Sequence, residues 1–184
     1  MNATGEALLN HPHPCGHIVF PYTNEAQFIE AVCLFTSAGL RKGDSALLVM
    51  EQSHCEPIRQ QLQGNGFDLA ELESRGQLIC EAAEGLMATF LFDGIIEEHA
   101  FKSRIAGLIE RAKEASSTGQ VRVFGEMVNL LWVENPGATH RLEELWNEVI
   151  KLHSVPLLCA YALGGNRPAV LPASLVACHS AAVV

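Results

Sequence analysis

Short apolar runs alternate along this chain with longer segments in which apolar residues recur at every third or fourth position. Each run is bounded by turn-forming residues, a pattern typical of strands. On this basis we expect five strands, at residues 17–20, 45–50, 77–80, 120–124 and 156–161. The second run is apolar throughout, which indicates a strand covered on both faces, as in a parallel sheet.

The segments between the runs have the periodicity of amphipathic helices. In the first of them Asn24 is in position to cap the helix and Gly39 to end it, and in the second Pro57 lies near the expected first turn. We expect Asp93-Gly94 to break a helix over residues 86–92. The other helices are expected at residues 69–75, 97–115, 127–133 and 138–153.

Strands that alternate with helices favour right-handed βαβ crossovers. The sequence therefore predicts an α/β fold, a three-layer α/β/α sandwich around a mostly parallel sheet. The 184 residues fit one such domain. Residues 1–16 are expected to form an N-terminal arm, and the Gly-, Pro- and Ala-rich residues 164–184 a C-terminal loop with an edge element or linker.

The net negative charge of the chain argues against one class of binding partner, nucleic acid. Lys and Arg total 12 against 21 Asp and Glu, a net charge of −9, so direct binding to nucleic acid is not expected. The chain shows no secretory signal and no apolar run of membrane-spanning length, so we expect a cytoplasmic protein without a membrane partner. The six cysteines include no CxxC pair, which favours reduced thiols.

The first strand-to-helix turn lacks the residues that hold a nucleotide. A phosphate loop needs glycines that let the backbone approach the phosphates and a lysine that contacts them. Residues 20–28 read Phe-Pro-Tyr-Thr-Asn-Glu-Ala-Gln-Phe and contain neither. We therefore expect no ATPase activity and no nucleotide cofactor.

Several blocks carry a resemblance to known families. Gly43-Asp44 before the second strand and Glu51 after it fit the order of elements in the KaiC and RecA type of ATPase core, here with a degenerate phosphate loop. More specifically, residues 17–163 resemble the MEDS domain, the methanogen/methylotroph, DcmR sensory domain. The blocks that carry this match are Phe124-Gly125-Glu126-Met127-Val128, Leu142-Glu143-Glu144-Leu145-Trp146-Asn147 and Leu157-Leu158-Cys159-Ala160-Tyr161, together with His17, Tyr22 and His54.

The resemblance implies a function. MEDS domains are similar to input modules of bacterial signalling proteins, so it implies a non-enzymatic sensory domain that binds a small organic molecule. The expected partner is a histidine kinase or another signalling output, such as a transcriptional regulator. A homodimer remains open, and an oligomeric scaffold is one alternative function.

Candidate site residues follow from the fold, because ligands of open α/β sheets bind outside the carboxyl ends of the strands. Carboxylates, a histidine and aromatic residues with polar tips fall there, a combination suited to a small organic ligand. Trp132 could instead belong to the core, and Cys159 could be a packed thiol. The expected ligand-binding residues are Tyr22, Glu51, His54, Glu126, Trp132, Cys159 and Tyr161.

A transition metal is the alternative cofactor, in a metal sensor or a metal-dependent enzyme. One ligand set would be His17, His54 and Glu126. Another would use the tract His-Pro-His-Pro-Cys-Gly-His, whose prolines hold neighbouring side chains in an extended arm. Its candidate ligands are His11, His13, Cys15 and His17. Against this set, the tract could simply be a frayed N-terminal segment.

Overall fold

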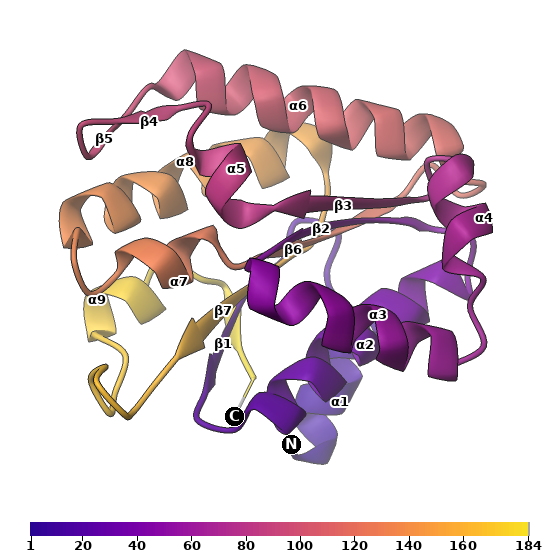
Figure 1. The fold of residues 1–184 in the computed structure, drawn as a ribbon, viewed down its shortest axis with the longest axis horizontal. Coiled ribbons are helices and arrows are strands. Elements are labelled where there is room, and N and C mark those ends of the chain that lie inside the picture. The colour runs from indigo at the N-terminus through magenta and orange to yellow at the C-terminus, as the bar shows by residue number, and fades with distance from the viewer. Residues whose placement is uncertain (184) are drawn as a thin grey trace.

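A six-stranded sheet forms the centre of the molecule in the computed structural model, which describes residues 1–183. Its strand order is β3-β2-β6-β7-β1-β8, and all of these pairs are parallel (Figure 1). The strands are β1 (His17–Tyr22), β2 (Ser45–Met50), β3 (Leu78–Ala82), β6 (Val121–Gly125), β7 (Leu157–Ala162) and β8 (Ala181–Ala182). The mostly parallel sheet predicted from the apolar runs is confirmed.

Helices cover both faces of this sheet, so the predicted three-layer α/β/α sandwich is also confirmed (Figure 1). One layer contains α1 (Ala3–Asn10), α2 (Glu25–Leu40), α3 (Gln52–Gly64) and α4 (Leu69–Ser74). The other contains α5 (Ala83–Met87), α6 (Glu98–Ala115), α7 (Met127–Leu131), α8 (Pro136–His153) and α9 (Ala173–Val176). None of the helices within residues 1–183 combines the length and the apolar character that crossing a membrane requires.

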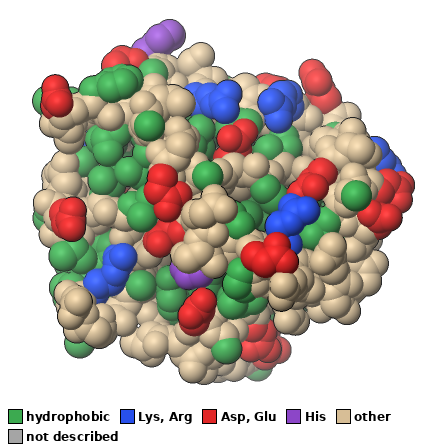
Figure 2. All heavy atoms as spheres, in the orientation of Figure 1, with side chains coloured by type: hydrophobic (Ala, Val, Ile, Leu, Met, Phe, Trp, Pro, Cys, Tyr) green, Lys and Arg blue, Asp and Glu red, His purple; other side chains and the backbone are tan. Residues whose placement is uncertain are grey.

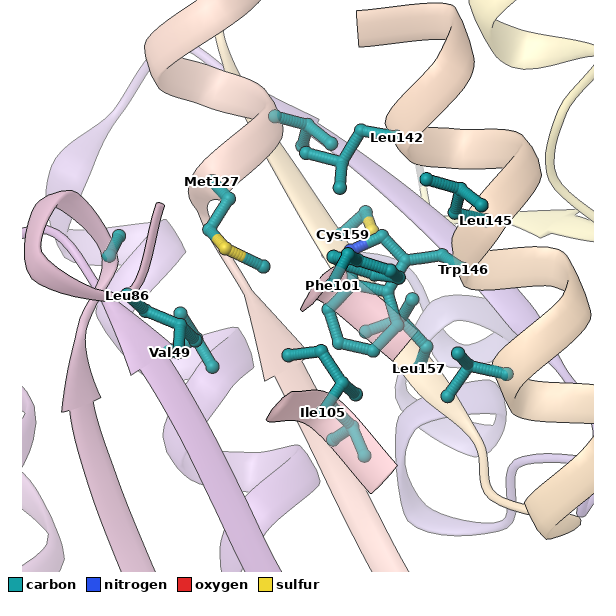
Figure 3. Close-up of a cluster of buried hydrophobic side chains, with 14 of the residues drawn as sticks. Val49, Leu86, Phe101, Ile105, Met127, Leu142, Leu145, Trp146, Leu157 and Cys159 are labelled. Atoms are coloured by element: carbon teal, nitrogen blue, oxygen red, sulfur yellow. The ribbon is translucent and has the colours of Figure 1, made fainter. Parts of the chain in front are cut away.

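Alternate residues of each strand face opposite layers, because side chains along a strand have a period of two. Ile18 and Leu158 join the core under α2 and α3, whereas Val19 and Cys159 join the core under α6 and α8. Figure 3 shows the second core, where Cys159 lies among apolar side chains that include Phe101 and Trp146. Side chains at the ends of the strands can therefore contact one another only if they face the same layer of helices.

The N-terminal residues form more than an arm, because they include α1. Its Leu9 is fully buried, and the carbonyls of Leu9 and Asn10 accept hydrogen bonds from Arg122 at 2.9 and 3.1 Å. Arg122 also donates to the carbonyl of Phe35 in α2 at 3.0 Å. One guanidinium of β6 therefore fastens two helices to the amino end of the sheet.

Two predicted helix boundaries are wrong. Gly39 lies inside α2, which runs to Leu40, and a Cβ at Gly39 would come within 2.6 Å of the Arg122 side chain. Gly39 thus allows the Arg122 side chain to pack closely against α2 and does not end the helix. Helix α3 begins at Gln52, so Pro57 falls inside it instead of at its first turn.

The expected helix at residues 86–92 is also wrong. Helix α5 ends at Met87, and the chain then forms a two-stranded hairpin, β4 (Leu91–Phe92) and β5 (Ile95–Ile96). Asp93 and Gly94 make its turn with φ of 50° and 77°. Positive φ at both central residues is the geometry that an Asp-Gly hairpin turn requires.

The C-terminal residues return to the sheet. After α9, strand β8 pairs with β1 through Ile18 and Ala181, and so forms an edge of the sheet. The side chain of Val183 then reaches α1, where a Cβ at Gly5 would lie 3.1 Å from Val183 Cγ1. The last described residue of the chain therefore lies beside the N-terminal helix.

Candidate functional site

Four neighbouring strands, β2, β6, β7 and β1, end at the same edge of the sheet (Figure 1). Glu51 follows β2, Glu126 follows β6, and Tyr22 is the last residue of β1. Crossover loops of parallel strands start at this edge, so the side chains that they carry meet there. We call the residues gathered at this place the carboxyl-edge cluster: Tyr22, Glu51, His54, Glu126, Asn129 and Arg167.

Glu126 is the centre of this cluster, and its side chain is fully buried. Its Oε2 accepts a hydrogen bond from the backbone N–H of Glu51 at 3.0 Å, and its Oε1 lies 2.8 Å from His54 Nδ1. Because a carboxylate has no proton to give, His54 Nδ1 is the donor of that bond. Both oxygens are thereby partnered, which makes burial of the carboxylate tolerable.

The environment raises the pKa of both His54 and Glu126. The hydrogen bond from His54 to Glu126 raises the pKa of the imidazole above its ordinary value of 6.5, and partial burial only opposes this. Burial raises the pKa of the Glu126 carboxyl. Within residues 1–183 the imidazole Nε2 has no protein partner, so it can offer a hydrogen bond to a bound molecule.

Aromatic rings form one side of the cluster. The Tyr22 ring stacks on Phe28 with centroids 4.5 Å apart, and Phe28 in turn lies 4.7 Å from the His54 ring. Burial, followed by the nearby carboxylates of Glu126 and Glu51, raises the pKa of the Tyr22 phenol. The hydroxyl therefore stays protonated and is available as a donor.

Asn129 and Arg167 belong to the cluster and were not predicted. Asn129 Nδ2 donates to Glu51 Oε1 at 2.5 Å, and its Oδ1 accepts from the backbone N–H of Ala162 at 2.8 Å. Arg167 Nη1 donates to the same Oδ1 at 3.0 Å. Arg167 lies in the loop after β7, so the rule that ligands bind beyond strand ends would have identified it. Asn129 lies at the start of α7, shortly after the end of β6, so the same rule would have identified it.

Tyr161, Cys159 and Trp132 do not join this cluster, which corrects the expected single crevice. Tyr22 is paired with Ala162 in the sheet, so Tyr161 is one residue out of step and points to the opposite face. There the Tyr161 hydroxyl donates to Glu143, and the ring meets Trp132 edge-on with centroids 6.0 Å apart. Trp132 is 3% exposed and belongs to the core. Burial raises the pKa of the Cys159 thiol well above its usual range, as expected for a packed thiol.

The expected metal sets are not brought together either. His17 lies with Glu143 and Cys159 on that opposite face, away from His54 and Glu126. In the N-terminal tract, His11 Nδ1 lies 3.3 Å from Lys42 Nζ, and His13 Nδ1 accepts from the backbone N–H of Cys15 at 3.2 Å. For residues 1–183, the side chains that converge as a metal could require are His17, Glu143, Cys159 and His179.

The carboxyl-edge cluster combines the buried Glu126 and Asn129 with the half-buried Tyr22, Glu51, His54 and Arg167. Five hollows of about 330 to 550 Å³ lie elsewhere on the molecule, and none of these five is lined by Tyr22, His54 or Glu126. Figure 2 shows acidic side chains spread over the visible face, with basic ones between them rather than gathered in one patch. The cluster therefore offers hydrogen-bonding groups held in place at an edge of the sheet.

A comparison with known protein families gives a match over most of the chain. The family model described as "MEDS: MEthanogen/methylotroph, DcmR Sensory domain" matches residues 16–180, most of the chain. This range includes every residue of the carboxyl-edge cluster. No curated protein matches the chain.

Proposed function

Because this chain belongs to the MEDS family of sensory domains, we propose that it is a non-enzymatic bacterial input domain that binds a small organic molecule at the carboxyl edge of its sheet. In this proposal, binding is passed to a histidine kinase or a transcriptional output. The observation that carries the proposal is the hydrogen-bonded pair of the buried Glu126 and the half-buried His54, close to the Tyr22 and Phe28 rings.

The cluster suits a ligand with an oxygen that accepts hydrogen bonds. Glu126 fixes the orientation of His54 through Nδ1, which directs Nε2 away from the carboxylate. A protonated Nε2 and the Tyr22 hydroxyl are both donors, and the stacked Tyr22 and Phe28 rings supply apolar contact. Small alcohols, aldehydes and carboxylates have this chemistry.

The first turn supports a ligand other than a nucleotide. Helix N-termini bind phosphate through backbone N–H groups that have no partner in the helix. In α2 the Asn24 side chain caps the helix, and its Oδ1 accepts from the N–H of Gln27 at 3.1 Å. This donor is therefore occupied, and no lysine stands in the turn to assist a phosphate.

The cluster joins both helical layers, which gives binding a way to change the structure. Glu51 and His54 lie at the start of α3, whereas Glu126 and Asn129 lie at the start of α7 in the other layer. A ligand that draws His54 away from Glu126 would loosen this connection. Signalling requires that the ligand bind one arrangement more tightly than the other.

Thermal-shift screening with small alcohols, aldehydes and carboxylates, followed by calorimetry on the hits, tests the proposal. We expect at least one compound to raise the melting temperature and its affinity to fall in His54→Gln and in Tyr22→Ala. His153→Gln is the matched control, because His153 makes the same 2.8 Å contact with a glutamate, Glu110, at a surface far along the chain. If every hit binds His54→Gln and Tyr22→Ala as tightly as the natural chain, the carboxyl-edge cluster is not the ligand site.

A further inference from the structure

A second polar cluster lies inside the molecule, on the sheet face under α8. It consists of His17 from β1, Glu143 from α8, Cys159 from β7, and His179 between α9 and β8. One ligand atom from each of the four lies within 4.8 Å of all the others. His17, Glu143 and Cys159 are buried, and the His179 side chain is 1% exposed. We call these four residues the buried cluster.

The separations of these atoms resemble the edges of a metal tetrahedron. His17 Nε2 lies 3.2 Å from Glu143 Oε2 and 3.3 Å from Cys159 Sγ. His179 Nε2 lies 3.3 Å from Glu143 Oε1, and Cys159 Sγ lies 4.0 Å from Oε2. Tetrahedral zinc with bonds of about 2.0–2.3 Å needs ligand atoms roughly 3.3–3.8 Å apart. One ligand atom from each residue already lies within 4.8 Å of the others, so changes of about 1 Å in these separations would reach this range.

The partner of His17 fixes which of its nitrogens carries the proton. Asn147 Nδ2 donates to the carbonyl of Cys178 at 3.0 Å, so its Oδ1 is the atom that faces His17. His17 Nδ1 lies 3.1 Å from this oxygen and must be the donor. In the neutral imidazole Nε2 then carries a lone pair, and it is directed at Glu143 and Cys159.

His179 repeats this arrangement. Its Nδ1 lies 2.9 Å from the carbonyl of Leu175, an acceptor, so Nδ1 carries a proton here too. Its Nε2 is buried and makes no hydrogen bond, although Glu143 Oε1 is near. A buried polar atom without a partner calls for a specific explanation. A lone pair beside a carboxylate is repelled, so either a proton or a metal ion must lie between His179 Nε2 and Glu143 Oε1.

We propose that His17, Glu143, Cys159 and His179 bind a divalent transition-metal ion of the zinc class. Two imidazoles, a thiolate and a carboxylate are the ligand types that zinc accepts. Metal-binding histidines characteristically donate their other N–H to a carbonyl or amide oxygen, as His17 and His179 both do. The Tyr161 hydroxyl donates to Glu143 and so holds the carboxylate in place.

The surroundings give the ion a route in and a structural role. A surface hollow of about 540 Å³ is lined by His17, Asn147, Cys178 and His179, so the buried cluster adjoins solvent on one side. Four protein ligands leave no open position, which is typical of structural rather than catalytic zinc. Because His179 follows α9, the ion would fasten the C-terminal segment to β1, β7 and α8.

Metal analysis of the chain, produced without a histidine tag, tests the proposal directly. Elemental analysis is expected to give about one zinc-class ion per chain, and removal by a chelator is expected to lower the melting temperature reversibly. Replacement with Co²⁺ is expected to produce the near-ultraviolet absorption of a sulfur-to-cobalt charge transfer. This last measurement uses the natural chain, so it does not depend on whether any variant folds.

Variants assign the ion to these four residues. We expect Cys159→Ser to abolish the charge-transfer band and His179→Gln to abolish stoichiometric binding. Asn147→Ala, which removes only the partner of His17, should weaken metal affinity by about 10–100-fold. Cys33→Ser is the matched control for a buried thiol, since Cys33 is equally buried in the other core.

Two results would overturn the proposal. The first is a chain that carries no metal when purified and gains no stability from added Zn²⁺ or Co²⁺. In that case protonated histidines, rather than an ion, balance Glu143. The second is metal that remains bound in Cys159→Ser and His179→Gln but is lost when His11, His13 and Cys15 are replaced, which would place the ion on the N-terminal tract.

Discussion

Glu126 is a buried carboxylate whose two oxygens are held by groups at the start of α3, which follows the neighbouring strand β2. Its position after β6 is fixed by its own backbone N–H, which donates to the carbonyl of Val49 at 3.0 Å. The N–H of Glu51 and the imidazole of His54 each contact one oxygen of its side chain. The protonation of His54 therefore reports directly on whether this arrangement forms.

We expect the pKa of His54 to lie above 6.5 in the folded chain, because its hydrogen bond to Glu126 favours the charged imidazole. Glu51 and Glu25 act in the same direction, whereas burial opposes them. A pH titration of the imidazole protons by NMR measures this value. Glu126→Gln should lower it, and an unchanged value in that variant would contradict the contact.

The same shift makes stability depend on pH in a defined direction. A group whose pKa is higher in the folded state stabilises that state while it is protonated. The stabilisation from His54 is therefore complete below its unfolded pKa near 6.5 and is lost as the pH rises through its folded value. Urea unfolding across this range should show the natural chain losing more stability than His54→Gln. Parallel pH profiles for the two would contradict it.

Gly39 and Gly107 are both helical glycines, but only Gly39 faces a packed neighbour. A Cβ at Gly39 would lie 2.6 Å from the Arg122 side chain, whereas one at Gly107 would meet nothing within 4 Å. Gly39→Ala should destabilise the fold by about 1–3 kcal/mol through overpacking. Gly107→Ala should stabilise it by about 0.5–1 kcal/mol, because alanine loses less entropy in a helix. Urea unfolding measures both, and equal effects would show that Arg122 yields freely.

Part of the carboxyl-edge cluster could be predicted, but the sheet face on which Tyr161 lies could not. Glu51, His54 and Glu126 follow strands that the apolar runs reveal, so their meeting followed from the fold class. Tyr161 was misplaced because a shift of one residue in strand pairing reverses the face of a side chain. The pairing of Tyr22 with Ala162 is a property of the assembled sheet.

At the scale of elements, Asn135 connects the β4–β5 hairpin to the start of α8. Its Oδ1 accepts from the N–H of Ala138 at 3.0 Å, and its Nδ2 donates to the carbonyl of Gly94 at 2.9 Å. Asn135→Ala should cost about 0.5–2 kcal/mol through loss of the cap. Asn135→Asp keeps the cap and loses only the link to the hairpin. Its free energy of unfolding in urea should therefore lie between those of the natural chain and Asn135→Ala. An Asp variant as unstable as the Ala variant would contradict this division.

The long helices could be predicted because their hydrophobic residues recur with a clear period. The shortest strands could not be predicted because they are too short to show one. Helix α6 was expected at residues 97–115 and runs over Glu98–Ala115, because its apolar stripe is continuous. The hairpin strands β4 and β5 have two residues each, too few to show a period. Asp93-Gly94 is a strong hairpin signal, but it was interpreted as a helix break because apolar residues before it also suit a helix.

At the scale of the whole molecule, Arg122 holds the amino end of the sheet together. It joins α1 and α2 through three carbonyls, and its Nε lies 3.4 Å from Asp44 Oδ2. Burial lowers its pKa, and the contact with Asp44 counters that effect. Replacing Arg122 by Leu would remove the donor to these carbonyls and the positive charge beside Asp44, which would keep its hydrogen bond from Thr118.

We therefore expect Arg122→Leu to destabilise the chain by about 3–5 kcal/mol, as for a broken buried ion pair. Hydrogen exchange followed by mass spectrometry should show faster exchange in α1 than in the natural chain, with α6 changed least under native conditions. Equal acceleration in α1 and α6 would mean that the variant unfolds globally and that Arg122 does not specifically dock α1.

The contact between Val183 and Gly5 brings the first and the last described segments of the chain close together. The same fold could therefore form from a chain in which these segments follow one another in a different order. A circularly permuted form, with a short flexible linker between the old termini and new termini opened between Asp93 and Gly94, would keep every strand pair of the central sheet. Exposed turns tolerate such cuts, and near termini tolerate such joins. An added domain could then be attached on the hairpin side, at the opposite helical layer from α1, without interrupting the sheet.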